Sequence, residues 1–285
     1  MISMNKNMMN KIIMHLKNES ELKNLFYLFL FSILSGSLFK FKRDFSQIAW
    51  VLASVLIVQV FLYFYLKENR FEKMLKMLTL SCYIAFGILL YFKNWNLYFH
   101  AASVLLTLLV YAWVKTASLK TTYNPLNLGI VLGICLFAPA TFHLNISSFI
   151  FQTTPLVLVL LAGCIITSLR NKWIPILGYV TSLIVFALID FLFFYGSLNY
   201  WIAPAFGFFG LVFIFLILPD HRIDFSSKIS VYIYGLAVGV LAIVLKKHEF
   251  FYFEYLSMFI VSTLVNIYKV FCGSFNSRGP IVSRV

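Results

Sequence analysis

Residues 174–196 read IPILGYVTSLIVFALIDFLFFYG, and residues 200–218 read YWIAPAFGFFGLVFIFLIL. Apart from Asp190, both stretches would be apolar on every face of a helix. Each is close to the length of about 20 residues that a helix needs to cross the hydrocarbon core of a bilayer. Strands of membrane β-barrels are only about 10 residues long and alternate in polarity, which excludes a barrel here. These stretches therefore predict membrane-spanning α-helices.

The rest of the chain has the same character. Its 285 residues are 61% hydrophobic and 12% charged, with a mean hydropathy of +0.90, whereas soluble domains have about 45–50% apolar and about 25% charged residues. We predict an all-α integral membrane protein with about ten transmembrane helices, which permits two inverted five-helix halves. The predicted spans are 24–39, 46–66, 75–92, 95–114, 126–142, 150–169, 174–196, 200–219, 230–246 and 251–271.

The polar segments leave no room for a separate soluble domain. We expect residues 1–23 to form a cytoplasmic or interfacial segment, 24–271 the transmembrane domain and 272–285 a cytoplasmic tail. A cleaved signal peptide is the alternative for the N-terminus, because Leu25 to Leu34 precedes the small residues Ser35 to Ser37. Cleavage would remove the first span and leave an odd number. Glycine and proline cluster in the fifth to eighth spans, where broken helices and close helix contacts are expected.

The net charge of +13 is explained by topology. With the N-terminus inside, 17 of the 23 Lys and Arg residues fall in inside segments and 6 in outside connections. This asymmetry predicts that both termini are cytoplasmic. A motif resemblance, described below, implies that this membrane is a bacterial inner membrane. Because the basic residues are scattered among apolar blocks and can contact anionic lipid headgroups, the lipid bilayer is the expected partner and nucleic acid is not.

Cysteine and histidine show no metal-binding pattern. The four Cys residues contain no CxxC spacing, and the five His residues have no spacing typical of zinc ligands. We therefore expect no metal site.

The polar connection 115–129 has a specific pattern. Asn124 suits the cap of a helix and Pro125 suits its first turn. Asn127 then enters the membrane in the first turn, where the helix dipole favours an anionic group. Two interpretations stay open: a well-capped helix, or a site for an anionic ligand.

A second polar stretch, residues 218–228, lies on the same predicted side of the membrane. Its Asp220 and Lys228 are suited to hold a polar headgroup or phosphate, whereas Ser227 is suited to cap the next helix. Both functions are compatible with this sequence.

Two further polar residues lie within predicted spans. Asp190 is the one acid well inside a span, where a carboxylate is costly unless it is paired, hydrated or protonated. It lines a transport pathway in one interpretation and meets outer-leaflet water in the other. Asn266 is a second pathway candidate. Glu254 lies one turn into its span, and we expect it at the interface.

Several motifs, in order along the chain, resemble those of one family. Tyr123-Asn-Pro125 follows a Lys-containing loop and resembles a Phe-Asn-Pro-Ala segment. Leu161-Ala-Gly163 and Trp173-Ile-Pro175 resemble Leu-Ala-Gly and Trp-x-Ile-Pro. Residues 213–228 resemble Phe-Phe-x-x-Thr-Asp-Pro-x-Thr, and Gly235 to Gly239 corresponds to a Gly-rich span. Over residues 110–271, this order resembles the membrane flavoprotein subunits RnfD and NqrB.

This resemblance implies a membrane subunit that binds FMN or riboflavin and passes electrons across the membrane with other subunits of an ion-pumping complex. It also implies a fold similar to that of urea and ammonium transporters. Family members attach one flavin to a Thr between the fifth and sixth spans, and Thr154 in Gln152-Thr-Thr-Pro-Leu156 occupies that connection. The connection is shorter than in the family and lacks Ser-Gly-Ala-Thr. An ordinary helix start is the alternative for Thr154, with the flavin bound non-covalently or absent.

The sequence therefore predicts a subunit for transmembrane electron transfer. One alternative is a small-solute channel or transporter, with Asp190, Asn127 and Asn266 along its pathway. Another is a membrane scaffold without redox activity. The residues implied in flavin binding are Asn124, Asn127, Thr154, Asp220 and Lys228.

Overall fold

The computed structural model is mostly helical where it describes the chain. It describes residues 53, 55, 57, 60, 78–85, 88, 102–110, 123–137, 160, 161, 163–165, 167, 168, 172–194, 208–221, 223, 225–248, 250 and 253–276. Within these ranges there is no strand, so the all-α prediction is confirmed for this part of the chain. The elements are α6 (Pro125–Phe137), α8 (Ile174–Phe194), α10 (Phe208–Val212), η4 (Phe213–Ile217), η5 (Leu218–Asp220), α11 (Lys228–Lys247) and α12 (Phe253–Asn276).

Two of these helices, α8 and α11, are long and apolar enough to cross a membrane. At 1.5 Å of rise per residue they are each about 30 Å long, which matches the hydrocarbon thickness of a bilayer. Their bounds agree with the predicted spans 174–196 and 230–246 to within two residues. The count of ten spans and the division at residues 23 and 271 stay predictions, because much of the N-terminal half lies outside the described residues.

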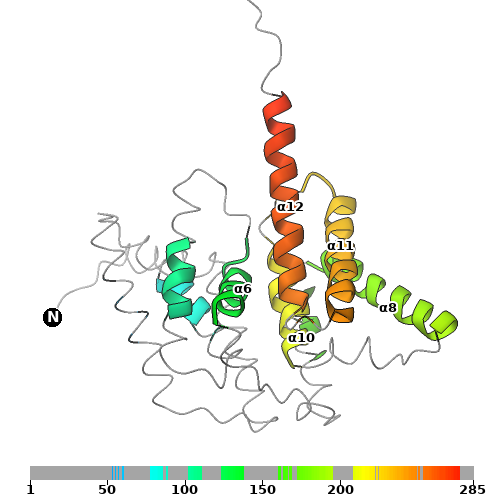
Figure 1. Cartoon of the computed structure of the whole chain (residues 1–285), viewed down its shortest axis with the longest axis horizontal. Coiled ribbons are helices and arrows are strands. Elements are labelled where there is room, and N and C mark those ends of the chain that lie inside the picture. The colour runs from blue at the N-terminus through cyan, green and yellow to red at the C-terminus, as the bar shows by residue number, and fades with distance from the viewer. Residues whose placement is uncertain are drawn as a thin grey trace, which may run out of the picture.

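The C-terminal helices pack in the order α6, α12, α11, α8 (Figure 1). Tyr123, just before α6, stacks on Phe259 of α12 with ring centroids 5.4 Å apart, and its hydroxyl lies 3.1 Å from Thr263 Oγ1. Tyr234 of α11 shares a buried hydrogen bond of 2.9 Å with Ser262 of α12. Polar side chains therefore join α12 to both of its neighbours.

Helices α8 and α11 approach each other at backbone distance because glycine occupies the contact. A Cβ atom at Gly235 would overlap the carbonyl of Pro175, and one at Gly178 would lie 2.8 Å from the amide nitrogen of Leu236. A Cβ at Gly239 would meet the side chain of Ser182. The close helix contact predicted at Gly178 is thus present, and its partner glycines lie in α11, the predicted ninth span, outside the fifth to eighth spans.

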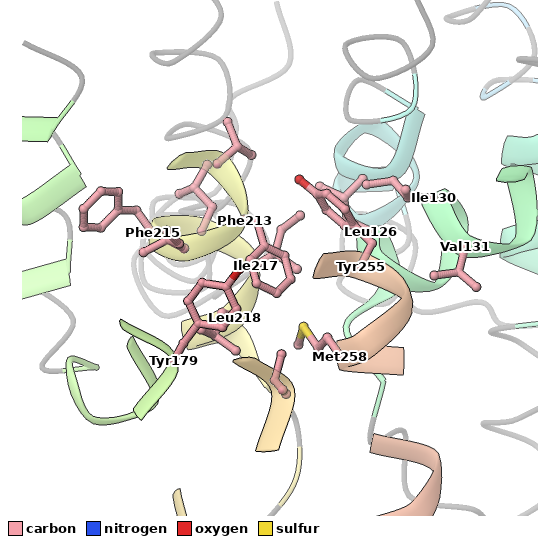
Figure 2. Packing of buried hydrophobic residues seen from close by; sticks show 14 of the residues in the cluster. Leu126, Ile130, Val131, Tyr179, Phe213, Phe215, Ile217, Leu218, Tyr255 and Met258 are labelled. Carbon is pink, nitrogen blue, oxygen red and sulfur yellow. The ribbon is translucent and has the colours of Figure 1, made fainter. Parts of the chain in front are cut away.

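Three buried aromatic rings form the centre of the core. Phe213 of η4 lies between Tyr179 of α8 and Tyr255 of α12, with ring centroids 5.5 Å and 5.1 Å away (Figure 2). Each of these three side chains is at most 1% exposed. Burying a large apolar side chain stabilises a fold by about 1.5–3 kcal/mol, so this group joins three elements firmly.

The segment that carries Phe213 is an irregular helix. Five residues of π-helix in η4 follow α10, and a 3-10 turn in η5 ends the segment at Asp220. Pro219 lacks the amide hydrogen that would continue a regular α-helix. The predicted span 200–219 is therefore helical at its described end, as one run of residues 208–220 with irregular π and 3-10 turns. π-Turns occur frequently at functional sites.

Candidate functional site

The N-terminus of α6 is capped within the chain. Asn124 Oδ1 accepts hydrogen bonds from the amides of Leu126 (2.9 Å) and Asn127 (3.0 Å), and the amide of Leu128 donates to the Asn124 carbonyl at 3.0 Å. Pro125 has no amide hydrogen. The predicted capping role of Asn124 is confirmed. Because these first-turn donors already have partners, they do not form an anion site.

The other end of the Asn124 side chain reaches a distant segment. Its Nδ2 donates to Asp220 Oδ2 at 3.1 Å, and the Asp220 carbonyl lies 3.5 Å from the same nitrogen. The two polar stretches predicted from the sequence therefore meet. Asn124 and Asp220 are 1% and 4% exposed, so this hydrogen bond lies in the protein interior.

Lys172 completes this group, which we call the polar junction (Asn124, Lys172 and Asp220). Its Nζ lies 3.8 Å from Asp220 Oδ1, and its side chain is 38% exposed whereas that of Asp220 is 6% exposed. The side chain of Lys172 thus extends from the surface and places its positive charge near a buried carboxylate. From the sequence, Lys172 is predicted only as one of the basic residues that set the membrane topology, because no nearby residue indicates that it pairs with Asp220.

Asn127 lies in the turn that Asn124 caps. It is 2% exposed, and its Oδ1 has no hydrogen-bond partner among the described residues. Leaving a buried acceptor without a donor costs about 1–3 kcal/mol. An orphaned amide oxygen in the turn that Asn124 caps fits a ligand that presents an N–H or O–H group.

An aromatic group follows the junction directly. The rings of His221, Phe225 and Tyr234 contact one another, with centroids 5.3–5.5 Å apart. Burial and, to a smaller extent, the nearby charge of Lys172 lower the pKa of His221 to about 4, against a backbone interaction with Ile223 that raises it. The imidazole is therefore neutral at physiological pH, and Asp220 and Lys172 are the charges of this site.

Lys228 is exposed at the first position of α11. Ser227 caps this helix, and its Oγ accepts a hydrogen bond of 3.1 Å from the amide of Ser230. The structure thus confirms the predicted helix cap in residues 218–228. It also shows a contact of Asp220 with Asn124 that the sequence did not predict. No described contact places Lys228 at the polar junction.

The remaining site predictions lie elsewhere. Asp190 is half-buried in the C-terminal half of α8, which extends away from α12 (Figure 1), and Asn266 is half-buried in α12. Thr154 lies outside the described residues. Glu254 is only 7% exposed, because α12 packs its first turn against the core, and its expected location at the membrane interface stays a prediction. Hydropathy alone did not reveal which face of that turn is covered.

A scan of protein-family models and a search of curated proteins each found no match to this chain.

Proposed function

We propose that the chain is a multi-pass membrane subunit of the RnfD/NqrB type that takes part in transmembrane electron transfer and binds a flavin non-covalently. The observation that carries this proposal is the hydrogen bond between Asn124 and Asp220. It joins Tyr123-Asn-Pro125 to residues 213–228, two of the segments on which the resemblance rests, at one buried site, although Leu218-Pro-Asp220 differs there from the family's Thr-Asp-Pro.

The residues of this site suit the polar edge of a flavin ring. The Asn127 Oδ1 lacks a donor, and the imide N–H of FMN or riboflavin would supply one. Lys172 brings a positive charge to the same site, which would stabilise the negative charge of a reduced flavin. The bound flavin would supply the one- and two-electron chemistry; the protein holds the ring, excludes water and sets the local charge.

An absorption spectrum of the purified protein tests this proposal. The full-length chain, prepared in mild detergent, is expected to be yellow with flavin bands. Asn127→Ala should lower the ratio of flavin to protein by about tenfold, since one hydrogen bond to the ring is lost. Asn266→Ala, which removes an amide elsewhere, should leave the ratio unchanged. A colourless protein that takes up neither FMN nor riboflavin would refute flavin binding.

Covalent attachment at Thr154 is a separate question with its own experiment. Colour that survives denaturation of the protein, and that Thr154→Ala abolishes, would assign an ester to this residue. Colour lost on denaturation would leave non-covalent binding alone. Co-purification of other membrane subunits under mild conditions would support a place in an electron-transfer complex, and reporter fusions at both termini would test their cytoplasmic location.

Solute transport is a second candidate, favoured by the irregular helix geometry of α10, η4 and η5. Discontinuous helices line the binding sites of many transporters with inverted repeats. If the chain conducts a small solute, flux into liposomes should fall in Asp190→Asn. Unchanged flux would remove the role of this acid, and flavin-free protein with measurable flux would favour transport over electron transfer.

A further inference from the structure

Helices α8 and α11 begin at the same end of the bundle. A Cβ atom at Gly235 of α11 would overlap the carbonyl of Pro175, in the first turn of α8. Further along both helices, a Cβ at Gly239 would meet the side chain of Ser182. The contacts advance in the same direction along both helices, so α8 and α11 run parallel. Two lysines therefore lie at this end, one just before α8 and one at the start of α11: Lys172 and Lys228.

Helix α12 runs in the opposite direction. It begins beside the end of α11, where Lys246 places its Nζ 5.9 Å from the ring centroid of Phe253. Near its other end, Lys269 places its Nζ 5.6 Å from the ring centroid of Phe225, which lies three residues before α11. The end at which α8 and α11 begin thus gathers three lysines, and we call this surface the basic end: Lys172, Lys228 and Lys269.

Side-chain contacts connect two of these lysines. The ring of Phe225, which Lys269 contacts, lies 5.3 Å from that of His221 between centroids. His221 follows Asp220, whose Oδ1 lies 3.8 Å from Lys172 Nζ. The side chain of Lys172 is 38% exposed, and the other two lysines are exposed. The basic end is therefore organised by packing around two rings, and its positive charges can be reached from outside the protein.

The two ends of these helices differ in charge. Asp220 is the one acid of the basic end among the described residues, and it is almost fully buried. Arg222 and Asp224 carry opposite charges and lie outside the described residues. Towards the opposite end, two lysines are accompanied by two acids: Lys246, Lys247, Asp190 and Glu254. Among the described residues, only the basic end therefore has an excess of positive charge that attracts anions.

Exposed apolar side chains follow the charges in sequence. On α11, Ile229 comes after Lys228 and is 70% exposed, and Ile233, one turn later, is 57% exposed. On α12, Tyr268 comes before Lys269 and is 68% exposed. This combination is typical of a membrane interface, where lysines reach phosphates, tyrosines lie among headgroups and aliphatic side chains meet acyl chains. Inorganic phosphate would leave the isoleucines in water, whereas a phospholipid covers them as well.

We propose that the basic end binds anionic phospholipids, with phosphates at Lys228 and Lys269 and acyl chains against Ile229 and Ile233. The dipole of α11 adds to the attraction, because the positive end of this 20-residue helix lies at Lys228. A lysine near an anionic membrane surface strengthens binding about fivefold. The inference requires only that these helices meet a bilayer. It depends neither on flavin binding or solute flux nor on which side of the membrane this end occupies.

Energy transfer from the tryptophans of the full-length protein to lipids with a pyrene-labelled acyl chain tests this proposal. Phosphatidylglycerol and phosphatidylcholine with the same chains are titrated separately into protein in mild detergent. The wild type should bind phosphatidylglycerol about tenfold more tightly, since more than one lysine contributes, and added salt should reduce this preference. Equal binding of the two lipids would overturn the proposal. Displacement of phosphatidylglycerol by an equal concentration of inorganic phosphate would also overturn it.

Lysine variants locate the binding surface. Lys269→Gln should weaken phosphatidylglycerol binding about fivefold and leave phosphatidylcholine binding unchanged, whereas Lys269→Arg keeps the charge and should bind like wild type. Lys228→Gln provides the same test if Lys269→Gln does not fold. Lys247→Gln changes an exposed lysine at the opposite end and is the matched control, which should bind like wild type. If Lys247→Gln weakens binding as much as the other Gln variants, the basic end is not the site.

Discussion

The contact between α8 and α11 differs in kind from the polar junction. The first is made by Gly178, Gly235 and Gly239, where two backbones touch without room for a Cβ atom. The second is made by Asn124 and Asp220, whose side chains form a buried hydrogen bond of 3.1 Å. One contact depends on the absence of side chains and the other on the exact chemistry of two of them.

This difference indicates that the two contacts have different roles in the protein. Small residues let helices pack closely where water and lipid offer no competing hydrogen bond, so the glycine contact is suited to a rigid frame. A buried polar group must instead keep its partners, and Asn127, which lacks one at Oδ1, marks where a ligand would add to the structure. The frame and the site should therefore respond differently to substitution.

The largest loss of stability is expected from substitution at the glycine contact between α8 and α11. Gly235→Leu would drive a side chain into the backbone at Pro175, and we expect a loss of about 3 kcal/mol or failure to fold. Thermal unfolding in detergent micelles measures this. Val244→Leu, at an exposed position of the same helix, is the control and should be nearly neutral. Equal stability of Gly235→Leu and wild type would contradict the backbone contact.

The next largest loss of stability is expected from substitution at the polar junction. Asp220→Ala leaves the Asn124 amide and the Lys172 ammonium without this carboxylate, and should cost about 2 kcal/mol. Asp220→Asn keeps an acceptor for Asn124 and should cost about half as much. The denaturant midpoints of the two variants provide the comparison. If Asn and Ala substitutions are equally damaging, the hydrogen bond contributes less than the charge pair with Lys172.

A smaller change in stability, which depends on pH, is expected from the titration of His221. Its pKa is about 4 in the folded protein, against about 6.5 in an unfolded chain. Between these values the unfolded chain binds a proton that the folded protein does not, so stability should fall as the pH is lowered from about 7 to 4. For this partly exposed ring we expect about 1–2 kcal/mol.

The variant His221→Phe isolates this effect. It keeps the ring contacts with Phe225 and Tyr234 but cannot titrate, so its stability should depend less on pH in the same window. Melting temperatures of wild type and variant, measured over this pH range, give the difference. Parallel curves would mean that other groups cause the pH dependence.

The smallest effect on stability is expected at Asn127, although it is almost fully buried. Asn127→Ala removes a buried acceptor that makes no hydrogen bond within the described residues but leaves a cavity, and because these two effects oppose each other the stability of flavin-free protein should change by less than about 1 kcal/mol. The same variant should lose flavin, as described above. Unfolding measured with and without added riboflavin separates the two. A large loss of stability without flavin would show that Asn127 is a structural residue.

Local patterns were enough to place several elements and caps. The bounds of α8 and α11, the cap at Asn124 and the cap at Ser227 follow from residues close together in sequence, and the structure contains all four. The burial of Glu254 did not follow, because it depends on which face of α12 the core covers. The proximity of Lys172 to Asp220 did not follow either, since no short-range pattern links them.

The sequence by itself determined that long apolar helices form, because helix length and side-chain polarity decide whether a segment suits the hydrocarbon core. It also determined how the helix ends are capped. Only the tertiary structure decided that Asn124 meets Asp220, a residue 96 positions further along the chain. Such a contact depends on how the helices between them pack, and that packing is set by the combined shapes of many side chains, among them the glycines that let α8 and α11 touch.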